Sequence, residues 1–577
     1  MRILGIEGTA WAASAAIFES DDLASAGDDH VFIETDAYLP DSGGIHPREA
    51  AEHMGETVPD VVETAIAHAY ERTSSSKPSS PIDAVAFSRG PGLGPCLRIV
   101  GTAARAVAQR FDVPLVGVNH MVAHLEVGRH RSGFDSPVCL NASGANAHVL
   151  GYRDGRYRVL GETMDTGVGN AIDKFTRHIG WQHPGGPKVE RHAREGEYHE
   201  LPYVVKGMDF SFSGIMSAAK QAVDADIPVD DVCRGLEEHI FGMLTEVSER
   251  ALSLTDADEL VLGGGVGQND RLQRMLGEMC EQRGAQFFAP ENRFLRDNAG
   301  MIALLGAKMY AAGDTLELAE SGIDSNFRPD AVPVSWRGRD SVGPAGRASG
   351  QSEAHSASNR SGERSEPRTD GRVDRSGRDE TEVQGAEATV RIESDRVVKL
   401  RHPRSYRHPS LDERLRTERT RQEVRLTSEA RQHGVPTPLV LDVDPQHSRI
   451  VFQHVGDADL RESLTTETVG AVGGHLARIH DAGFVHGDPT TRNVRVVSPD
   501  ASREQRVFLI DFGLGYYTDE PEDHAMDLHV LAQSLAGTAD DPDALFDAAT
   551  DAYRAEREDA DAVFASLNDI EGRGRYQ

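Results

Sequence analysis

The segment that decides the fold of the first half of the chain is ELVLGGGVGQNDR, residues 259–271. Its first residues, Glu259–Leu262, predict a short buried strand, and three glycines follow at once. A helix is expected to begin near Arg271. Glycines at such a turn let the backbone approach a phosphate, and the amides of the helix N-terminus favour an anion. The segment therefore predicts either a nucleotide-binding turn or simply a tight connection between strand and helix.

The same alternation of strand and helix extends over residues 1–330. Such alternation argues for an α/β domain with a largely buried sheet. No internal repeat is visible in the sequence. The other expected strands are Ile3–Ile6, Ala84–Ser88, Leu115–Val118 and Val138–Asn141, and the expected helices are Met54–Tyr70, Arg98–Arg110, Val232–Leu254 and Arg271–Arg283.

Changes in composition divide the chain into three segments. Residues 335–382 are rich in Ser, Gly, Arg, Asp and Glu and contain few aromatic or β-branched residues. Such a segment buries too little apolar surface to offset its ordering entropy, so we expect a disordered polar linker. It would join a first domain over 1–334 to a second domain over 383–577. Short strands up to Leu400, followed by a long helix over 412–432, predict that the second domain is α+β.

The chain of 577 residues has a net charge of −32, and only seven of its 61 basic residues are lysines. Proteins that bind nucleic acids usually have a basic surface. The strong acidic excess of this chain therefore needs another explanation. At about 1 M salt the Debye length is roughly 3 Å, and repulsion within an acidic surface is screened. An acidic chain with few lysines therefore indicates a halophilic source with a salt-rich cytoplasm.

We expect the protein to unfold at a higher temperature in molar KCl than in dilute buffer. The reason is that salt screens the repulsion between its many acidic side chains. Thermal melts followed by circular dichroism in the two buffers measure the difference. Equal midpoints would instead indicate an ordinary acidic protein.

The four cysteines, Cys96, Cys139, Cys233 and Cys280, are scattered and form no CxxC pair. They predict a cytoplasmic protein with neither a disulfide framework nor a zinc ribbon. No apolar run approaches the roughly 18 residues that span a bilayer, so we expect no membrane partner. The first residues, Met1–Ile6, predict a strand rather than a signal peptide.

Two histidines four residues apart, His120 and His124, would lie on one face of a helix. Two imidazoles in that geometry can share a divalent metal ion, although most such pairs serve other purposes. A zinc peptidase of the HExxH kind needs a glutamate after the first histidine, and Met121 stands there. Asp297 is a candidate third ligand, and its alternative role is to cap the following helix. These ligand types suit iron or zinc.

A series of motifs then occurs in the order that is typical of one enzyme family. They are GIEGTA (5–10), HMVAH (120–124), SGAN (143–146), DKF (173–175), PGGPKVE (184–190), KGMDFSFSG (206–214), GGGVGQN (263–269) and RDN (296–298). Over about residues 1–330 the chain resembles the TsaD-like tRNA threonylcarbamoyltransferases. The resemblance implies an actin-like or Hsp70-like ATPase fold, in which two RNase H-like lobes enclose the site.

Carried over position by position, the resemblance implies that His120, His124 and Asp297 hold the metal ion, with iron favoured over zinc. Archaeal relatives carry a tyrosine ligand where this chain has Asn141, which leaves the fourth metal position to a weaker ligand or water. Relatives usually carry a histidine where this chain has Trp11, to which we assign no role. The residues implied to bind threonylcarbamoyl-AMP are Asn141, Ala142, Ser143, Gly144, Ala145, Asp173, Gly186, Glu190 and Asn269.

The implied reaction is attack by N6 of adenosine 37 of a tRNA on the carbamoyl carbon, with AMP as the leaving group. The metal ion would act as a Lewis acid and template. Adenosine 37 lies in the anticodon loop of tRNAs that read codons beginning with A, so the base must be unstacked and presented to the site. The implied partners are tRNA, a threonylcarbamoyl-adenylate synthase that supplies the substrate, and other small KEOPS subunits.

The second domain carries residues that are typical of a kinase. Lys399 lies in a strand-like run, where a kinase needs a lysine that pairs with ATP phosphates and with a helix carboxylate. Glu423 is the best candidate for that carboxylate, and Glu418 is the alternative. The run Gly385, Ala386, Glu387, Ala388 stands in place of a full glycine-rich loop over the nucleotide.

Asp488, in the run HGD, stands five residues before Asn493, and Asp511 opens the run DFG. That spacing suits a catalytic Asp488 with Asn493 and Asp511 as ligands of the magnesium ion that accompanies ATP. The segment 383–577 resembles the small PRPK-like kinase of the KEOPS complex, which is related to RIO kinases. The resemblance implies an atypical serine/threonine kinase or an ATPase that supports or regulates the tRNA reaction.

Several alternatives stay open at the level of sequence. The chain could be a signalling protein kinase that uses its N-terminal domain as a regulatory nucleotide-binding module. The arginines of the helix over 412–432, and those at 573–575, could contact tRNA phosphates or simply face solvent. A linker of this length also permits the two domains to dock within one chain or between chains.

Overall fold

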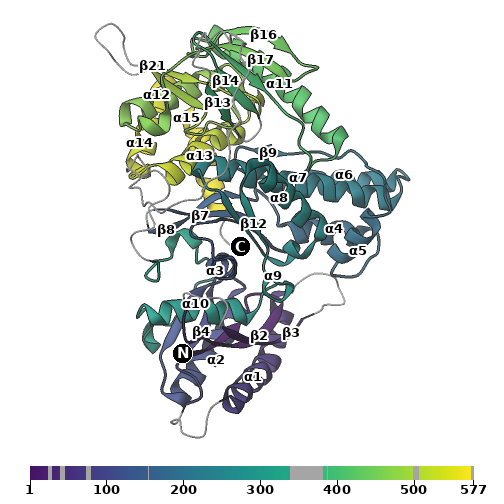
Figure 1. Ribbon diagram of the computed structural model, residues 1–577, viewed down its shortest axis with the longest axis vertical. Helices are drawn as coiled ribbons and strands as arrows, with labels where there is room; N and C mark the ends of the chain where they lie inside the picture. Colours follow the sequence, from purple (N-terminus) through teal and green to yellow (C-terminus); the bar gives the residue numbers. More distant parts are fainter. Residues whose placement is uncertain are drawn as a thin grey trace, which may run out of the picture.

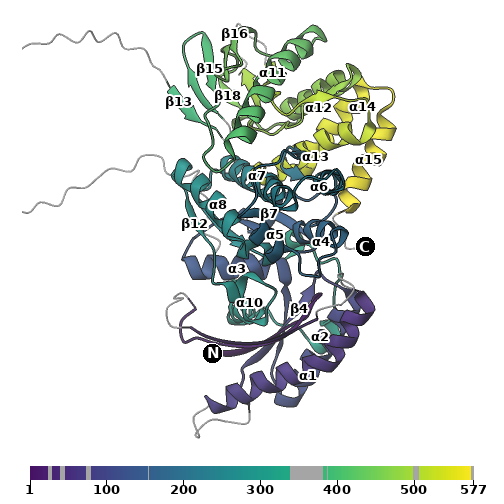
Figure 2. The same ribbon diagram turned by 90° about the vertical axis from the view of Figure 1, so that its right-hand side faces the viewer.

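The computed structural model describes residues 1–23, 29–38, 46–72, 80–153, 155–337, 381–385, 388–497 and 506–573. The expected nucleotide-binding residues Ala386 and Glu387 lie outside this described part. The disordered linker over 335–382 stays a prediction, because residues 338–380 also lie outside it. Figures 1 and 2 show three bodies stacked along the longest axis: an N-terminal lobe, a middle lobe and a C-terminal domain.

The N-terminal lobe is built on one mixed sheet. Its strands lie in the order β3 (His30–Ala37), β2 (Ala12–Glu19), β1 (Arg2–Glu7), β4 (Ala84–Gly90) and β5 (Leu115–Asn119). Leu4 and Ile6 on one face of β1 pack with α1 (Pro47–Glu71) and α2 (Gly94–Phe111). Ile3 on the opposite face packs with α10 (Ala299–Ala311). The sheet is therefore covered on both faces, as the apolar strands predict.

The middle lobe repeats this topology. Its strands lie in the order β12 (Gln286–Phe288), β11 (Glu259–Gly263), β6 (Val138–Ala142), β7 (Ala147–Arg153) and β8 (Arg156–Glu162). In both sheets the central strand is antiparallel to one neighbour and parallel to the other. The structure thus contains a repeat that the sequence does not reveal. The expected fold of two RNase H-like lobes is confirmed.

Helices cover the middle sheet on both faces. Leu140 and Leu262 pack with helices α4 to α8, whereas Cys139 and Val261 face α3. These helices are α3 (His120–Ser132), α4 (Val168–His178), α5 (Gly186–Ala193), α6 (Ser213–Asp224), α7 (Val229–Thr255) and α8 (Asp270–Arg283). A short hairpin, β9 (Val205–Lys206) and β10 (Asp209–Phe210), and the single-turn α9 (Asn292–Leu295) complete the lobe.

The C-terminal domain is α+β, as predicted. Its larger sheet has the order β13 (Thr381–Gln384), β14 (Thr389–Ile392), β15 (Arg396–Leu400), β17 (Arg449–Gln453) and β16 (Val440–Asp444), next to α11 (Pro409–Gln432). Two small sheets follow: β18 (Ala458–Asp459), β20 (Val494–Val497) and β21 (Arg506–Leu509), and then β19 (Phe484–Val485) with β22 (Tyr516–Tyr517). The helices are α12 (Thr466–Asp481), α13 (Pro521–Thr538), α14 (Pro542–Glu556) and α15 (Ala560–Arg573).

The two domains dock within the chain, and α7 is the centre of the contact. Two glutamates of α7, Glu246 and Glu249, are buried against arginines of the C-terminal domain. Arg407 and Arg419 lie 2.6 and 3.0 Å from oxygens of Glu246, and Arg404 lies 3.0 Å from Glu249. Arg419 of α11 therefore has a role that neither sequence alternative included, since it is part of this buried interface.

The hairpin β9–β10 forms a second part of the interface. The Gly207 amide donates to the Gly487 carbonyl at 2.8 Å, and Lys206 pairs with Asp523 at 2.5 Å. Gly207 has φ +58, and a Cβ there would meet Val530 Cγ2 at 2.4 Å. Glycine therefore allows this close approach. Among the described helices, none is long and apolar enough to cross a membrane.

Candidate functional site

The predicted metal ligands lie together between the two lobes of the first domain. The side chain of Asn119 caps α3 by accepting two backbone amides, so the helix begins at His120. Nε2 of His120 lies 3.3 Å from Oδ1 of Asp297, and Nε2 of His124 lies 3.4 Å from the same oxygen. The three ligand atoms all lie within 4.8 Å of one another. Two nitrogens and one carboxylate oxygen thus point at one place.

Glu7 contacts the metal-ligand cluster through His120. Its fully buried carboxylate lies 3.2 Å from Nδ1 of His120, which leaves Nε2 directed at Asp297. Burial alone would lower the pKa of His120, but the carboxylates of Glu7 and Asp297 raise it to about 10. The cluster therefore favours positive charge, and its donor set fits a divalent ion such as iron or zinc.

Trp11 orients the third ligand. Its indole Nε1 donates to Oδ2 of Asp297 at 2.9 Å, which leaves Oδ1 for the histidines. The alternative role of Asp297 as a helix cap is wrong, because the neighbouring Asn298 caps α10 by accepting the Met301 amide at 3.1 Å. Sequence comparison assigned Trp11 no role, because a tryptophan stands where relatives carry a histidine.

Asn141 lies close to this cluster at the end of β6. Its side chain is fully buried, and its Nδ2 donates to Met121 Sδ at 3.5 Å. Its Oδ1 has no hydrogen-bond donor within the described residues. A Cβ on Gly264 would meet this oxygen at 2.6 Å, and one on Gly263 would meet His124 Cβ at 3.2 Å. The glycine turn therefore lies between Asn141 and the metal ligands.

The other residues that were expected to bind the adenylate all belong to the middle lobe. Asp173 Oδ1 accepts the Gly185 amide at 2.7 Å and so shapes the turn that opens α5. A Cβ on Gly144 or on Gly186 would meet no atom within 4 Å, so open space borders the backbone at both glycines. Ser143, Gly144 and Ala145 follow β6, Asp173 lies in α4, Gly186 and Glu190 lie in α5, and Asn269 caps α8.

Asn269 has partners that the sequence did not indicate. Its Oδ1 caps α8 by accepting the Arg271 amide at 2.8 Å, and its Nδ2 donates to Glu237 Oε1 at 2.7 Å. Glu237 belongs to α7, and burial raises the pKa of its carboxyl to about 7. The helix that carries the interdomain glutamates therefore also contacts an expected adenylate-binding residue.

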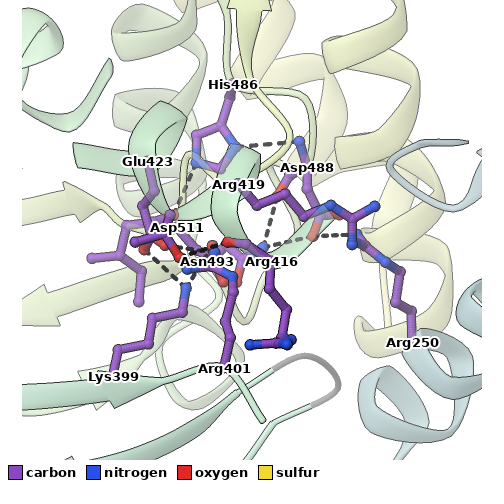
Figure 3. Close-up of polar contacts among 12 residues, drawn as sticks. Arg250, Lys399, Arg401, Arg416, Arg419, Glu423, His486, Asp488, Asn493 and Asp511 are labelled. Atoms are coloured by element: carbon purple, nitrogen blue, oxygen red, sulfur yellow. Dashed lines mark hydrogen bonds and ion pairs between the residues drawn. The ribbon is translucent and has the colours of Figure 1, made fainter. Parts of the chain in front are cut away.

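The kinase-like residues meet in one cleft of the C-terminal domain (Figure 3). Nζ of Lys399 lies 2.8 Å from Glu423 Oε1 and 2.7 Å from Asp511 Oδ1. Arg401, which the sequence did not single out, donates to Glu423 Oε2 at 2.6 Å. Glu418 is exposed on the same helix, so Glu423 is the carboxylate that pairs with Lys399.

Asp488 and Asn493 lie on the opposite side of this cleft. Asn493 Nδ2 donates to Asp488 Oδ2 at 2.9 Å, as their spacing suggests. The cleft encloses a pocket of about 310 Å³. Gly385, Ala388, Lys399, Glu423, Asp488, Asn493 and Asp511 all line it.

The loop that carries Asp488 is held by a residue that the sequence did not reveal. Asp527, buried in α13, accepts the amides of His486 and Gly487 at 2.7 and 2.8 Å. Gly487 has φ +80, and a Cβ there would meet the Leu514 carbonyl oxygen at 2.3 Å. Glycine and Asp527 together therefore fix the backbone next to Asp488.

Known proteins are similar to this chain over its whole length. The profile of the family described as TsaD, tRNA N6-adenosine threonylcarbamoyltransferase, matches residues 29–304. A protein of Haloarcula marismortui named probable bifunctional tRNA threonylcarbamoyladenosine biosynthesis protein is 76% identical over 100% of both chains. Proteins with the same name from Halobacterium salinarum and Methanospirillum hungatei are 65% and 46% identical over 100% of this chain and 99% of theirs. The chain belongs to this bifunctional family.

Membership in the bifunctional family confirms the predicted class, a tRNA-modifying transferase joined to a kinase-like domain. The full-length match means that the relatives carry both domains in one polypeptide, in the same order. A signalling kinase with a merely regulatory first domain is therefore not supported. The metal-ligand cluster of the first domain and the kinase-like cluster of the second domain therefore belong to one tRNA-modifying protein.

Proposed function

We propose that the domain over 1–334 transfers the threonylcarbamoyl group from threonylcarbamoyl-AMP to N6 of adenosine 37. Its substrates would be tRNAs that read codons beginning with A. The domain over 383–577 would bind ATP with magnesium and support this reaction as an atypical kinase or ATPase. The observation that carries the proposal is the convergence of His120, His124 and Asp297 between two lobes, in a chain whose relatives are named for this pathway.

The residues of the first domain would share the work as follows. His120, His124 and Asp297 would hold one divalent ion, iron in preference to zinc, that polarises the bound carbamoyl group. Glu7 and Trp11 would keep the ligands oriented, since each contacts one of them directly. The turns at Asn141–Ala145 and at Gly186, with Asp173, Glu190 and Asn269, would bind the adenylate.

The residues of the second domain suit phosphoryl transfer from ATP. Lys399, held by Glu423, would neutralise phosphate charge, and Asn493 and Asp511 would bind magnesium. Asp488 would be the catalytic carboxylate that accepts the proton of the attacking hydroxyl or water. The partners in this proposal are the tRNA anticodon loop, an adenylate synthase that supplies the substrate, and the small KEOPS subunits, all in the cytoplasm.

A reconstitution tests the proposal directly. The full chain is combined with tRNA, ATP, threonine, bicarbonate, a threonylcarbamoyl-adenylate synthase and the small KEOPS subunits, and the tRNA nucleosides are analysed by mass spectrometry. We expect threonylcarbamoyladenosine to appear only with the full chain present. A tRNA with guanosine at position 37 is the matched control. Product from the control tRNA, or no product from either tRNA, would contradict the proposal.

A further inference from the structure

The nucleotide pocket of the C-terminal domain is completed by the first domain. Most of the residues around it belong to the kinase-like fold, but one wall comes from the transferase side of the interface. That wall is formed by Met208, Arg250, Ser253 and Leu254. The last three belong to α7, so this helix reaches from the middle lobe into the pocket of the second domain.

Arg250 is the charged residue of this wall, and its position is well defined. Its Nη2 donates to Glu246 Oε1 at 3.0 Å, one turn earlier on α7. Its Nη1 donates to Asp488 Oδ2 at 3.0 Å, across the domain boundary. Only 7% of its side chain is exposed. Figure 3 shows Arg250 entering from α7 and ending at the carboxylate of Asp488.

We propose that Arg250 is a catalytic arginine that the transferase domain supplies to ATP hydrolysis in the C-terminal domain. The inference rests on the proposed role of this pocket as an ATP site. In phosphoryl transfer, charge develops on the oxygens of the γ-phosphoryl group, and an arginine supplied from outside the nucleotide-binding core stabilises it. Arg250 lies beside Asp488, the carboxylate expected to face the acceptor, so its charge lies on the acceptor side of the γ-phosphate.

The acceptor that best suits this wall is water. Met208, Ser253 and Leu254 line the pocket together with Arg250, which contacts Asp488, so the first domain already occupies space that a peptide acceptor would need. The water oxygen would bond to the γ-phosphorus, and the bond from that phosphorus to the bridging oxygen would break. ADP would leave with the electron pair, and Asp488 would accept the proton of the water. Arg250 would keep its charge and bind a γ-phosphate oxygen.

Two substitutions in the full chain test the role of Arg250. We expect Arg250→Ala to lower kcat for ATP hydrolysis by about 10³-fold, the lower end of the effect of such arginines. ADP affinity should change little, because the β-phosphate side of the pocket is unaltered. Arg250→Lys should recover only part of the rate, since lysine lacks the planar fork. Added guanidinium chloride should partly restore the rate of ATP hydrolysis in Arg250→Ala. It should not raise the rate of the wild type.

Arg414→Ala is the matched control. It removes another arginine that pairs across the interface, 3.4 Å from Glu200, but Arg414 does not line the pocket and Glu200 is exposed, so docking should persist. We expect this variant to keep most of the ATP hydrolysis. An equal loss in Arg414→Ala, or wild-type turnover in Arg250→Ala, would overturn the proposal and leave the ATP site itself intact. Wild-type turnover in Asp511→Asn would instead overturn the assignment of the ATP site.

Discussion

Replacing His120 and His124 together by alanine is expected to remove the metal ion from the first domain and to abolish modification of adenosine 37. The two imidazoles supply two of the three ligand atoms, and the third is Oδ1 of Asp297. One carboxylate would remain, and a single oxygen ligand does not retain iron or zinc in competition with water. Elemental analysis of the purified protein measures the metal, and nucleoside mass spectrometry after reconstitution measures the product.

The control for this double variant is His178→Ala. His178 is partly exposed and pairs with Asp224 on the surface, away from the cluster, so its loss should affect neither metal content nor product. ATP turnover by the C-terminal domain should also persist in the double variant, because the two clusters lie in different domains. If the double variant still modified adenosine 37 at the wild-type level, the metal-site assignment would be wrong.

The part of the fold that the sequence predicts is the part with simple local patterns. The strands β1, β4, β5, β6 and β11 are short apolar runs that are buried on both faces, and their positions were predicted within two residues. β2 was missed because four of its eight residues are alanine, which does not favour strands. β8 was missed because Arg156, Arg158 and Glu162 interrupt its apolar positions. The repeated topology was therefore invisible, although half of its strands were predicted.

The site shows the same division between motif and context. Residues within the motifs could be named because their spacing has a chemical meaning, as for the histidine pair on α3. Trp11 and Asp527 act through contacts to residues far away in the sequence, and nothing beside them marks that role. Glu7 lies within the motif GIEGTA, but its contact with His120 joins residues 113 positions apart, which the motif does not show. The same holds for Arg250, which is one charged position within an otherwise ordinary predicted helix. Pairing across such separations depends on the tertiary fold, which one sequence does not specify residue by residue.

Glu246→Gln is expected to separate the two domains. The side chain of Glu246 is buried, with 1% of its surface exposed. Its carboxylate lies 3.0, 2.6 and 3.0 Å from Arg250, Arg407 and Arg419. Glutamine keeps the size of the side chain but removes the charge, so three buried guanidinium groups lose their common partner. Breaking a buried ion pair on one side typically costs about 3–5 kcal/mol. That is roughly a 10²- to 10⁴-fold weaker association of the domains.

A protease site inserted between residues 338 and 380 makes this association measurable. After cleavage in molar KCl, the wild-type halves should stay together in size-exclusion chromatography, whereas the Glu246→Gln halves should separate. Glu200→Gln is the control, because Glu200 is 60% exposed and pairs with Arg414 at 3.4 Å on the surface. Such a pair contributes at most about 1 kcal/mol. If the Glu246→Gln halves stayed together with unchanged affinity, the buried network would not be what holds the domains. If the halves separate, we also expect ATP turnover to fall. That fall would link docking to Arg250, because Glu246 contacts both Arg250 and the arginines of the C-terminal domain.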